Sequence, residues 1–175
     1  MTESRKKLSL ILFTLISIIS FITDYASKQW ALKTLTPGAE QPFLGDFITL
    51  KLHFNPGAAF SFLVNSTWIF TIFALVIILG IAVSIRKLNS PGWAVALGLM
   101  FGGAIGNFID RLTQPPAFGI GHVVDFLNWN NWFIGNVADI WIVVAAGLIF
   151  VLVLLNEPFN GIKETTGSEK EKADE

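Results

Sequence analysis

The sequence predicts a membrane protein made mainly of α-helix, with four transmembrane helices, a small extracytoplasmic β-structure and a short surface helix. Of its 175 residues, 53% are hydrophobic and only 14% are charged, whereas soluble domains carry about 25% charged residues. Four apolar stretches are long enough to span a bilayer. One further segment alternates polar and apolar residues, as a half-buried strand does. We expect one domain over residues 1–160.

The four predicted transmembrane helices cover residues 8–33, 68–86, 93–112 and 137–156. The first follows the basic run Arg5–Lys7 and begins like a secretory signal peptide. The helical pattern continues to residue 33, however, and no small-x-small cleavage site follows promptly. We therefore expect an uncleaved helix.

Small residues mark the third predicted helix. Glycines recur at every fourth position from Gly98 to Gly106, which lets helix backbones approach closely. Packing explains these glycines. It does not explain the polar residues Asn107, Asp110 and Arg111 at the end of the same helix.

The β-structure is expected within residues 43–63. Apolar and polar residues alternate from Phe47 to Phe54, with the period of two of a half-buried strand. The turn Asn55–Gly57 ends this strand, and residues 58–63 begin either a second strand or a short surface helix. Later in the chain, residues 122–126 are predicted to form a short strand or an extended entry, and the aromatic segment 128–132 is predicted to lie at the membrane interface.

Composition excludes several classes of function. A net charge of -1 gives no reason to expect nucleic acid as a partner. Without cysteine, the chain cannot form disulfides, use thiol catalysis or bind metal through thiolates. The two histidines, His53 and His122, stand apart and do not form a metal-binding motif. We expect neither a metal nor a cofactor.

The distribution of positive charge predicts the orientation. With a cytoplasmic N-terminus, eight Lys and Arg residues lie inside and four outside, which favours cytoplasmic N- and C-termini. Residues 161–175 are expected to form a disordered, charged cytoplasmic tail. In this orientation, polar residues from distant parts of the chain meet at the outer face: Asp24, Asp110, Arg111, Asp125 and Asp139.

Asp125 and Asp139 are the candidate catalytic residues. Two close aspartates do not both ionise easily, so they tend to share a proton. The ionised one can deprotonate a water that attacks a peptide carbonyl, while the protonated one donates to the carbonyl oxygen or the leaving amine. Asp139 is predicted near a helix N-terminus, where the helix dipole favours the ionised form.

Other interpretations compete with proteolysis. Intramembrane carboxylates also mark ion pathways in transporters, but those scatter ionisable groups through the membrane depth and often have repeated halves. A structural assembly protein would not need polar residues gathered on one face. Asp24 and Lys28, four residues apart on one helix face, form either a salt bridge at the membrane edge or a polar pair that supports the site.

Several short motifs, in order along the chain, resemble those of the signal peptidase II family, the lipoprotein signal peptidases. Asp24 and Lys28 resemble the polar pair that ends the family's first helix. The other matching blocks are Asn55–Ser61 (NPGAAFS), Gly102–Leu112 (GGAIGNFIDRL), Val123–Phe126 (VVDF) and Asn136–Asp139 (NVAD). Each block is weak evidence alone, but five in order on a chain with four predicted spans are specific.

The resemblance implies an aspartic endopeptidase of the bacterial inner or plasma membrane, with Asp125 and Asp139 as its dyad. Its substrates would be prolipoproteins whose Cys carries diacylglycerol, cut just N-terminal to that Cys. The enzyme would act as a monomer in contact with membrane lipid, and residues 43–63 would form a β-cradle on the outer membrane face. The residues implied to line or support the site are Asp24, Lys28, Asn55, Gly106, Asn107, Asp110, Arg111, Asn136 and Ala138.

The chain departs from the family pattern in two respects. Gly135 stands where the family commonly has Phe, and the interval between Asp125 and Asp139 is short compared with many members. Both departures fall within Leu127–Gly135, which we expect to be a loop that closes over the site.

Overall fold

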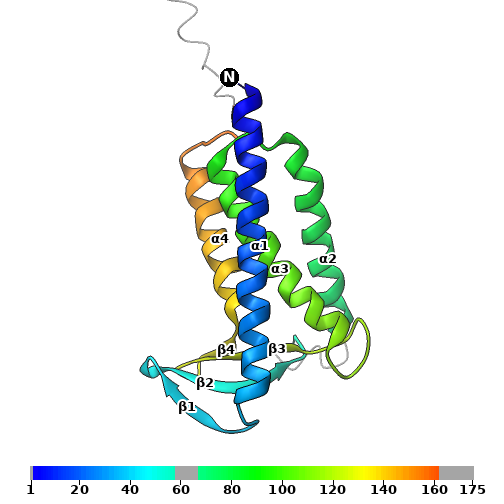
Figure 1. The fold of residues 1–175 in the computed structure, drawn as a ribbon, viewed down its shortest axis with the longest axis vertical. Coiled ribbons are helices and arrows are strands. Elements are labelled where there is room, and N and C mark those ends of the chain that lie inside the picture. Colours follow the sequence, from blue (N-terminus) through cyan, green and yellow to red (C-terminus); the bar gives the residue numbers. More distant parts are fainter. Residues whose placement is uncertain (1, 58–66, 162–175) are drawn as a thin grey trace, which may run out of the picture.

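Four helices lie side by side, and a small sheet lies across one end of them (Figure 1). The computed structural model describes residues 2–57 and 67–161. The predicted second strand or surface helix at 58–63 and the predicted tail beyond residue 161 lie outside this part. The helices are α1 (Thr2–Thr34), α2 (Thr67–Ser84, extended by the 3-10 turn η1, Ile85–Lys87), α3 (Pro91–Thr113) and α4 (Val137–Leu154).

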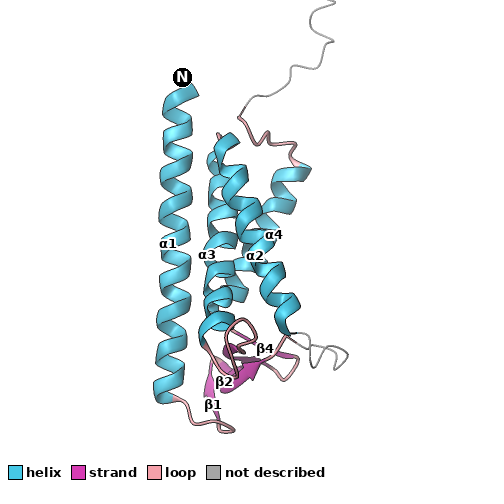
Figure 2. Ribbon diagram, turned by 90° about the vertical axis from the view of Figure 1, so that its right-hand side faces the viewer, coloured by secondary structure: helices cyan, strands magenta, loops and turns pink. Residues whose placement is uncertain are grey.

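The four predicted transmembrane helices are confirmed within the described residues, with ends that shift by a few residues. Each of the four is long and apolar enough to cross a membrane. The largest shift is at α1, which begins at Thr2 because the basic run continues the helix before the apolar stretch starts. Figure 2 shows the sheet at the end of the bundle opposite the start of α1.

Helix α3 lies at the centre of the bundle and packs against the other three helices. Its glycines explain the close contacts. A Cβ atom at Gly102 would lie 2.5 Å from the Ser17 carbonyl oxygen of α1, and one at Gly103 would lie 2.8 Å from the Ala138 carbonyl oxygen of α4. The predicted small-residue face therefore brings the backbones of α1 and α4 against α3.

The sheet is antiparallel, with the strand order β1-β2-β3-β4. The strands are β1 (Glu40–Phe43), β2 (Gly45–Asn55), β3 (Val123–Trp129) and β4 (Phe133–Gly135). Half of these strands come from the connection between α3 and α4. β3 agrees with the short strand or extended entry predicted at residues 122–126, whereas β4 and most of β1 lie outside the predicted β-structure.

The prediction of a loop over Leu127–Gly135 was wrong, because this segment forms most of a β-hairpin. Trp129 pairs with Phe133, and the turn between them has Asn130 and Asn131 at positive φ, a conformation that Asn tolerates better than most residues. β3 is buried along nearly its whole length, so it lacks the polar alternation that identifies a half-exposed strand.

A hydrophobic cluster joins the sheet to the bundle. Ala31 and Leu35 at the end of α1 pack with Leu50 of β2 and with Val124 and Phe126 of β3. This contact fixes β3 across the end of the helices. The first turn of α4 follows directly after β4, so it is placed beside β3 as well.

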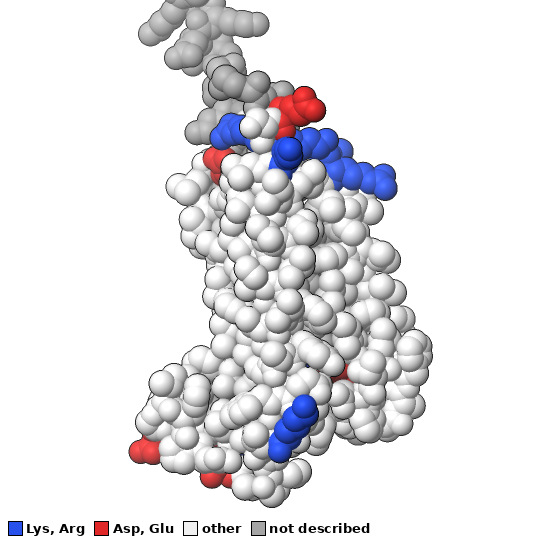
Figure 3. Space-filling model, in the orientation of Figure 1, with Lys and Arg blue, Asp and Glu red and all other residues white. Residues whose placement is uncertain are grey.

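The outer surfaces of α2 and α4 are apolar and exposed, with Phe73, Val76, Val143 and Phe150 among the most exposed residues. Figure 3 shows a broad band without charged residues, and charged residues beyond it towards both ends of the molecule. This distribution suits helices that face lipid along their length and water at their ends.

Candidate active site

The first turn of α4 positions Asp139. Asn136 is the N-cap of this helix. Its side-chain oxygen accepts the Asp139 N–H at 3.0 Å, and Asp139 Oδ2 accepts the Asn136 N–H at 3.0 Å. This reciprocal pair is a capping box, which the spacing Asn-x-x-Asp allows. The carboxylate is thereby held at a helix N-terminus, where the helix dipole stabilises negative charge.

Strand β3 positions Asp125, whose exposed fraction is only 1%. Asn55, at the end of the neighbouring strand, donates to Asp125 Oδ2 at 2.8 Å. Asn136 donates to Asp125 Oδ1 at 2.6 Å. Because Asn136 bonds to both Asp125 and Asp139, the two aspartates share one amide neighbour, and the sequence prediction that they converge is confirmed.

The environment of Asp125 favours its protonated form. Burial is the main cause, and the negative charge of Asp139 adds to it; together they raise the pKa of Asp125 to about 7. The hydrogen bonds from Asn55 and Asn136 act in the opposite direction. Asp125 can therefore hold a proton near neutral pH while a second carboxylate stands beside it.

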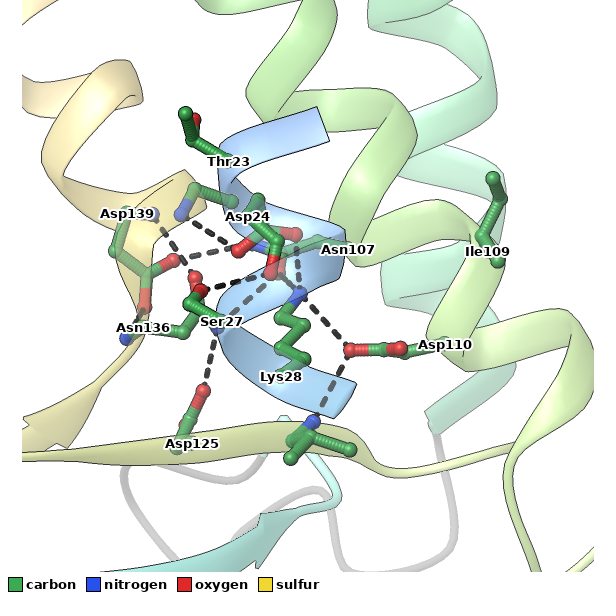
Figure 4. A network of polar contacts seen from close by, with 12 residues as sticks. Thr23, Asp24, Ser27, Lys28, Asn107, Ile109, Asp110, Asp125, Asn136 and Asp139 are labelled. Atoms are coloured by element: carbon green, nitrogen blue, oxygen red, sulfur yellow. Dashed lines mark hydrogen bonds and ion pairs between the residues drawn. The ribbon is translucent and has the colours of Figure 1, made fainter. Parts of the chain in front are cut away.

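A buried ion cluster lies beside the two aspartates (Figure 4). The Lys28 ammonium contacts Asp24 Oδ2 at 2.8 Å, Asp110 Oδ2 at 2.9 Å and Asn107 Oδ1 at 2.8 Å. These three partners match the three N–H groups of an ammonium. Since Asp24 and Lys28 have exposed fractions of 0% and 1%, their pair faces the interior of the protein beside the two aspartates.

The two acidic partners of Lys28 also bind backbone near the aspartates. Asp24 Oδ1 accepts the Ala138 N–H of α4 at 2.8 Å. Asp110 Oδ2 accepts the Val124 N–H of β3 at 3.1 Å. The ion cluster therefore ties α1 and α3 to the two elements that carry Asp125 and Asp139.

Asn107 connects the ion cluster to the two aspartates. Its side-chain oxygen accepts from Lys28 at 2.8 Å and from Asn136 at 3.1 Å. Its side-chain nitrogen donates to Asp139 Oδ1 at 3.0 Å. One amide thus orients Asn136 and Asp139 together.

Two glycines leave room for carboxylates. A Cβ atom at Gly106 would collide with the Asp24 carboxylate. At Gly135, where the chain departs from the family pattern, a Cβ atom would lie 2.8 Å from Asp139 Oδ2. In this chain, therefore, the residue before Asn136 is a glycine that the Asp139 carboxylate approaches closely.

Arg111 was predicted to line or support the site, and its positive charge interacts with Asp125, Asp110 and Asp139. Its guanidinium lies 5.5 Å from the centre of the Phe70 ring of α2, and it donates to the Gly121 carbonyl at 3.3 Å. It therefore supports the loop that leads into β3. Phe70 and Gly121 were not among the predicted residues, and no sequence pattern marks them as partners of Arg111.

The aromatic residues of the β3–β4 hairpin pack against one another. Trp129 stacks on Phe133 with 5.8 Å between ring centres, and Trp132 packs edge-on against Phe47 at 6.0 Å. Phe60, in the motif block Asn55–Ser61, lies outside the described residues. Within residues 2–57 and 67–161, no group of three or more His, Asp or Glu side chains is arranged to hold a metal ion.

The sequence profile of the family described as Signal peptidase (SPase) II matches residues 16–155. The chain belongs to this family. It is 40% identical to a lipoprotein signal peptidase of Rhodococcus jostii (strain RHA1) over 155 residues, covering 89% of this chain and 78% of the relative. A lipoprotein signal peptidase of Mycobacterium avium (strain 104) is also 40% identical, over 97% of this chain and 90% of the relative.

Solved structures agree with this assignment. A bacterial membrane enzyme superposes with a TM-score of 0.72 at 29% identity, covering 81% of this chain and 92% of the other. A second one gives a TM-score of 0.72 at 28% identity, covering 88% and 93%. This signal peptidase II family member is thus a peptidase and a multi-pass membrane protein, and the transporter and structural interpretations are set aside.

Proposed function

We propose that the protein is an aspartic endopeptidase that cleaves prolipoproteins whose Cys carries diacylglycerol, just N-terminal to that Cys. The observation that carries the proposal is the pair Asp125 and Asp139, joined by Asn136 and held in unequal surroundings. Unequal surroundings of this kind suit an acid and a base in the same site.

In the proposed mechanism, Asp139 is the base and Asp125 the acid. Ionised Asp139 takes a proton from a water molecule, whose oxygen attacks the scissile carbonyl carbon. Protonated Asp125 donates its proton to the carbonyl oxygen or to the leaving amine as the C–N bond breaks. The Asn55, Asn107 and Asn136 amides hold the two carboxyl groups in place and carry no charge of their own.

The position of the pair suits a lipid-modified substrate. Acyl chains keep such a substrate in the bilayer, so its scissile bond lies near the membrane interface. Asp125 and Asp139 lie where the sheet meets the end of the helices. We propose cytoplasmic N- and C-termini with the sheet on the outer face, as the distribution of Lys and Arg favours. A reporter domain fused after Lys51 should be accessible from outside the cell, and cytoplasmic location would contradict this orientation.

We also propose that the enzyme acts as a monomer without a metal, and that the Asp125 and Asp139 carboxyl groups supply the acid and the base of the reaction.

The test is cleavage of a diacylglyceryl prolipoprotein by purified Asp125→Asn and Asp139→Asn variants. Each should remain folded and lose roughly 10²–10⁴-fold in rate, the usual contribution of a positioned acid or base. The matched control is Asp46→Asn, which changes an exposed aspartate of β2 and should cleave like the wild type. Substantial cleavage by either of the first two variants would contradict the proposed dyad.

A further inference from the structure

The end of the bundle opposite the sheet carries a basic pocket that the proposed catalysis does not use. It has a volume of about 370 Å³ and is lined by Lys6 of α1, Arg86 and Lys87 of η1, and Leu88, Asn89 and Asn160. All three cations are exposed, and none forms an ion pair within the described residues. Three positive charges from two elements therefore converge on one pocket.

Asn89 contributes a polar group to this pocket that lacks a partner. Its backbone N–H donates to the Phe159 carbonyl at 3.1 Å, which fixes the chain after α4 against η1. Its side-chain oxygen is buried and accepts no hydrogen bond from any described residue. Buried polar atoms are normally hydrogen-bonded, so this oxygen would gain a hydrogen bond if the Asn89 side chain turned towards a ligand with a donor group in the pocket.

An apolar groove of about 550 Å³ begins at the same place. Lys87 lines both the groove and the basic pocket. The walls of the groove include Ile77 and Ile81 of α2 and Trp93 of α3. The Trp93 ring is held by two contacts. Its Nε1 donates to the Glu157 carbonyl at 2.9 Å, and the ring forms a T-shaped contact with the Phe159 ring, with 5.5 Å between ring centres.

The groove has the length of an acyl chain. Lys87 and Ile77 are ten residues apart, which corresponds to a rise of about 15 Å along a helix. This is half the hydrocarbon thickness of about 30 Å. At Gly80, in the wall of the groove, a Cβ atom would meet nothing within 4 Å, so the groove is open there.

We propose that this pocket and groove bind one anionic phospholipid. Its phosphate lies among Lys6, Arg86 and Lys87, a hydroxyl of a glycerol headgroup donates to Asn89, and one acyl chain occupies the groove. In the proposed orientation this end faces the cytoplasmic leaflet, where basic pockets between transmembrane helices bind anionic headgroups. The basic start of a substrate signal peptide fits poorly, because the three cations would repel it.

The first experiment tests the role of the cations. It compares lipid retention by two double variants of the full-length protein, measured by native mass spectrometry. The protein is equilibrated with equal amounts of dioleoyl phosphatidylglycerol and dioleoyl phosphatidylcholine. Arg86→Gln with Lys87→Gln should lower retention of phosphatidylglycerol roughly 30-fold, since each cation near a membrane surface contributes about a factor of five. Arg5→Gln with Lys7→Gln removes the same charge from α1 outside the pocket. An equal loss in both double variants would overturn the proposal.

The second experiment tests the placement of the acyl chain. It uses Gly80→Leu, which fills the groove without changing charge. This variant should lose most of the retained phosphatidylglycerol while its catalytic rate stays at the wild-type value and its unfolding temperature does not fall. Unchanged retention would overturn the placement of the acyl chain. Glycerol phosphate, tested as a competitor, should not displace the lipid at equal concentration; displacement would indicate a site for a small free anion and would also overturn the proposal.

Discussion

The two ends of the helical bundle both carry charge, but they hold it differently. At the sheet end, Asp24, Lys28 and Asp125 have exposed fractions of 1% or less, and each has a direct polar partner. At the other end, Lys6 and Arg86 are exposed and form no ion pair within residues 2–57 and 67–161.

This difference separates exposed charge at one end of the bundle from buried charge at the other, where the proposed reaction would take place. Exposed cations at a membrane surface remain hydrated and cost little. Removing ions from water costs several kcal/mol per ion, which an ion pair only partly offsets. The buried cluster around Lys28 therefore contributes little to the free energy of unfolding by itself. It contacts Asn107 and the backbone next to Asp139, so its role is to position these residues.

Replacing Lys28 should have the largest effect on stability. Lys28→Met leaves Asp24 and Asp110 buried without their cation, and removal of one partner of a buried ion pair costs about 3–5 kcal/mol. Thermal unfolding in detergent measures the change. Lys7→Met removes an exposed cation at the other end and should leave the unfolding temperature unchanged. Equal effects of the two substitutions would contradict the distinction between the two ends.

Glycine substitutions should give a smaller contrast. A methyl group at Gly106 collides with the Asp24 carboxylate, so Gly106→Ala should destabilise the protein by about 1–3 kcal/mol, as overpacking does. The same change at Gly80 meets nothing within 4 Å, and should be neutral or stabilise the helix by up to about 1 kcal/mol. The comparison is made by denaturant or thermal unfolding. A stable Gly106→Ala variant would show that the carboxylate can move aside.

Asn55→Ala should change the pH dependence of cleavage more than the stability. The hydrogen bond from Asn55 lowers the pKa of Asp125, so its loss raises that pKa further. Because the acid must be protonated, activity is lost as the pH rises through this pKa. The falling limb of the pH–rate profile should therefore move to higher pH in Asn55→Ala. Gln41→Ala, an exposed change in β1 of the same sheet, should leave the limb in place, and a shift to lower pH in Asn55→Ala would contradict the assignment of Asp125 as the acid.

The helices could be predicted from sequence because each one is a long apolar run, and because glycine spacing marks the packed face of α3. The full length of β3 and its hairpin with β4 could not be predicted in this way. β3 is buried along nearly all of its length, and its pairing joins residues as far apart as Ile48 and Trp129. Neither alternation nor a nearby turn marks such a strand, so its last residues were expected to form a loop.

The family resemblance indicated most residues of the candidate site, but their contacts with one another were predictable only where the geometry is local. The spacing of Asn136 and Asp139 contains the capping box, and the charge bias places the acidic residues at one end. The bond from the Ala138 N–H to Asp24 joins residues 114 positions apart, and the position of Asn107 between Lys28 and Asp139 depends on three helices meeting. The contact of Arg111 with the Phe70 ring of α2 also depends on tertiary structure and has no marker in the sequence.

The central claim is that Asp125 and Asp139 form one acid–base pair that shares a proton. The measurement that tests it most directly is the rate of prolipoprotein cleavage by the wild-type enzyme across the pH range in which it stays folded. The account predicts a bell-shaped profile, with a rising limb as the pair loses its first proton and a falling limb near the Asp125 pKa of about 7. A rate that stays constant from well below to well above that pKa would contradict the claim.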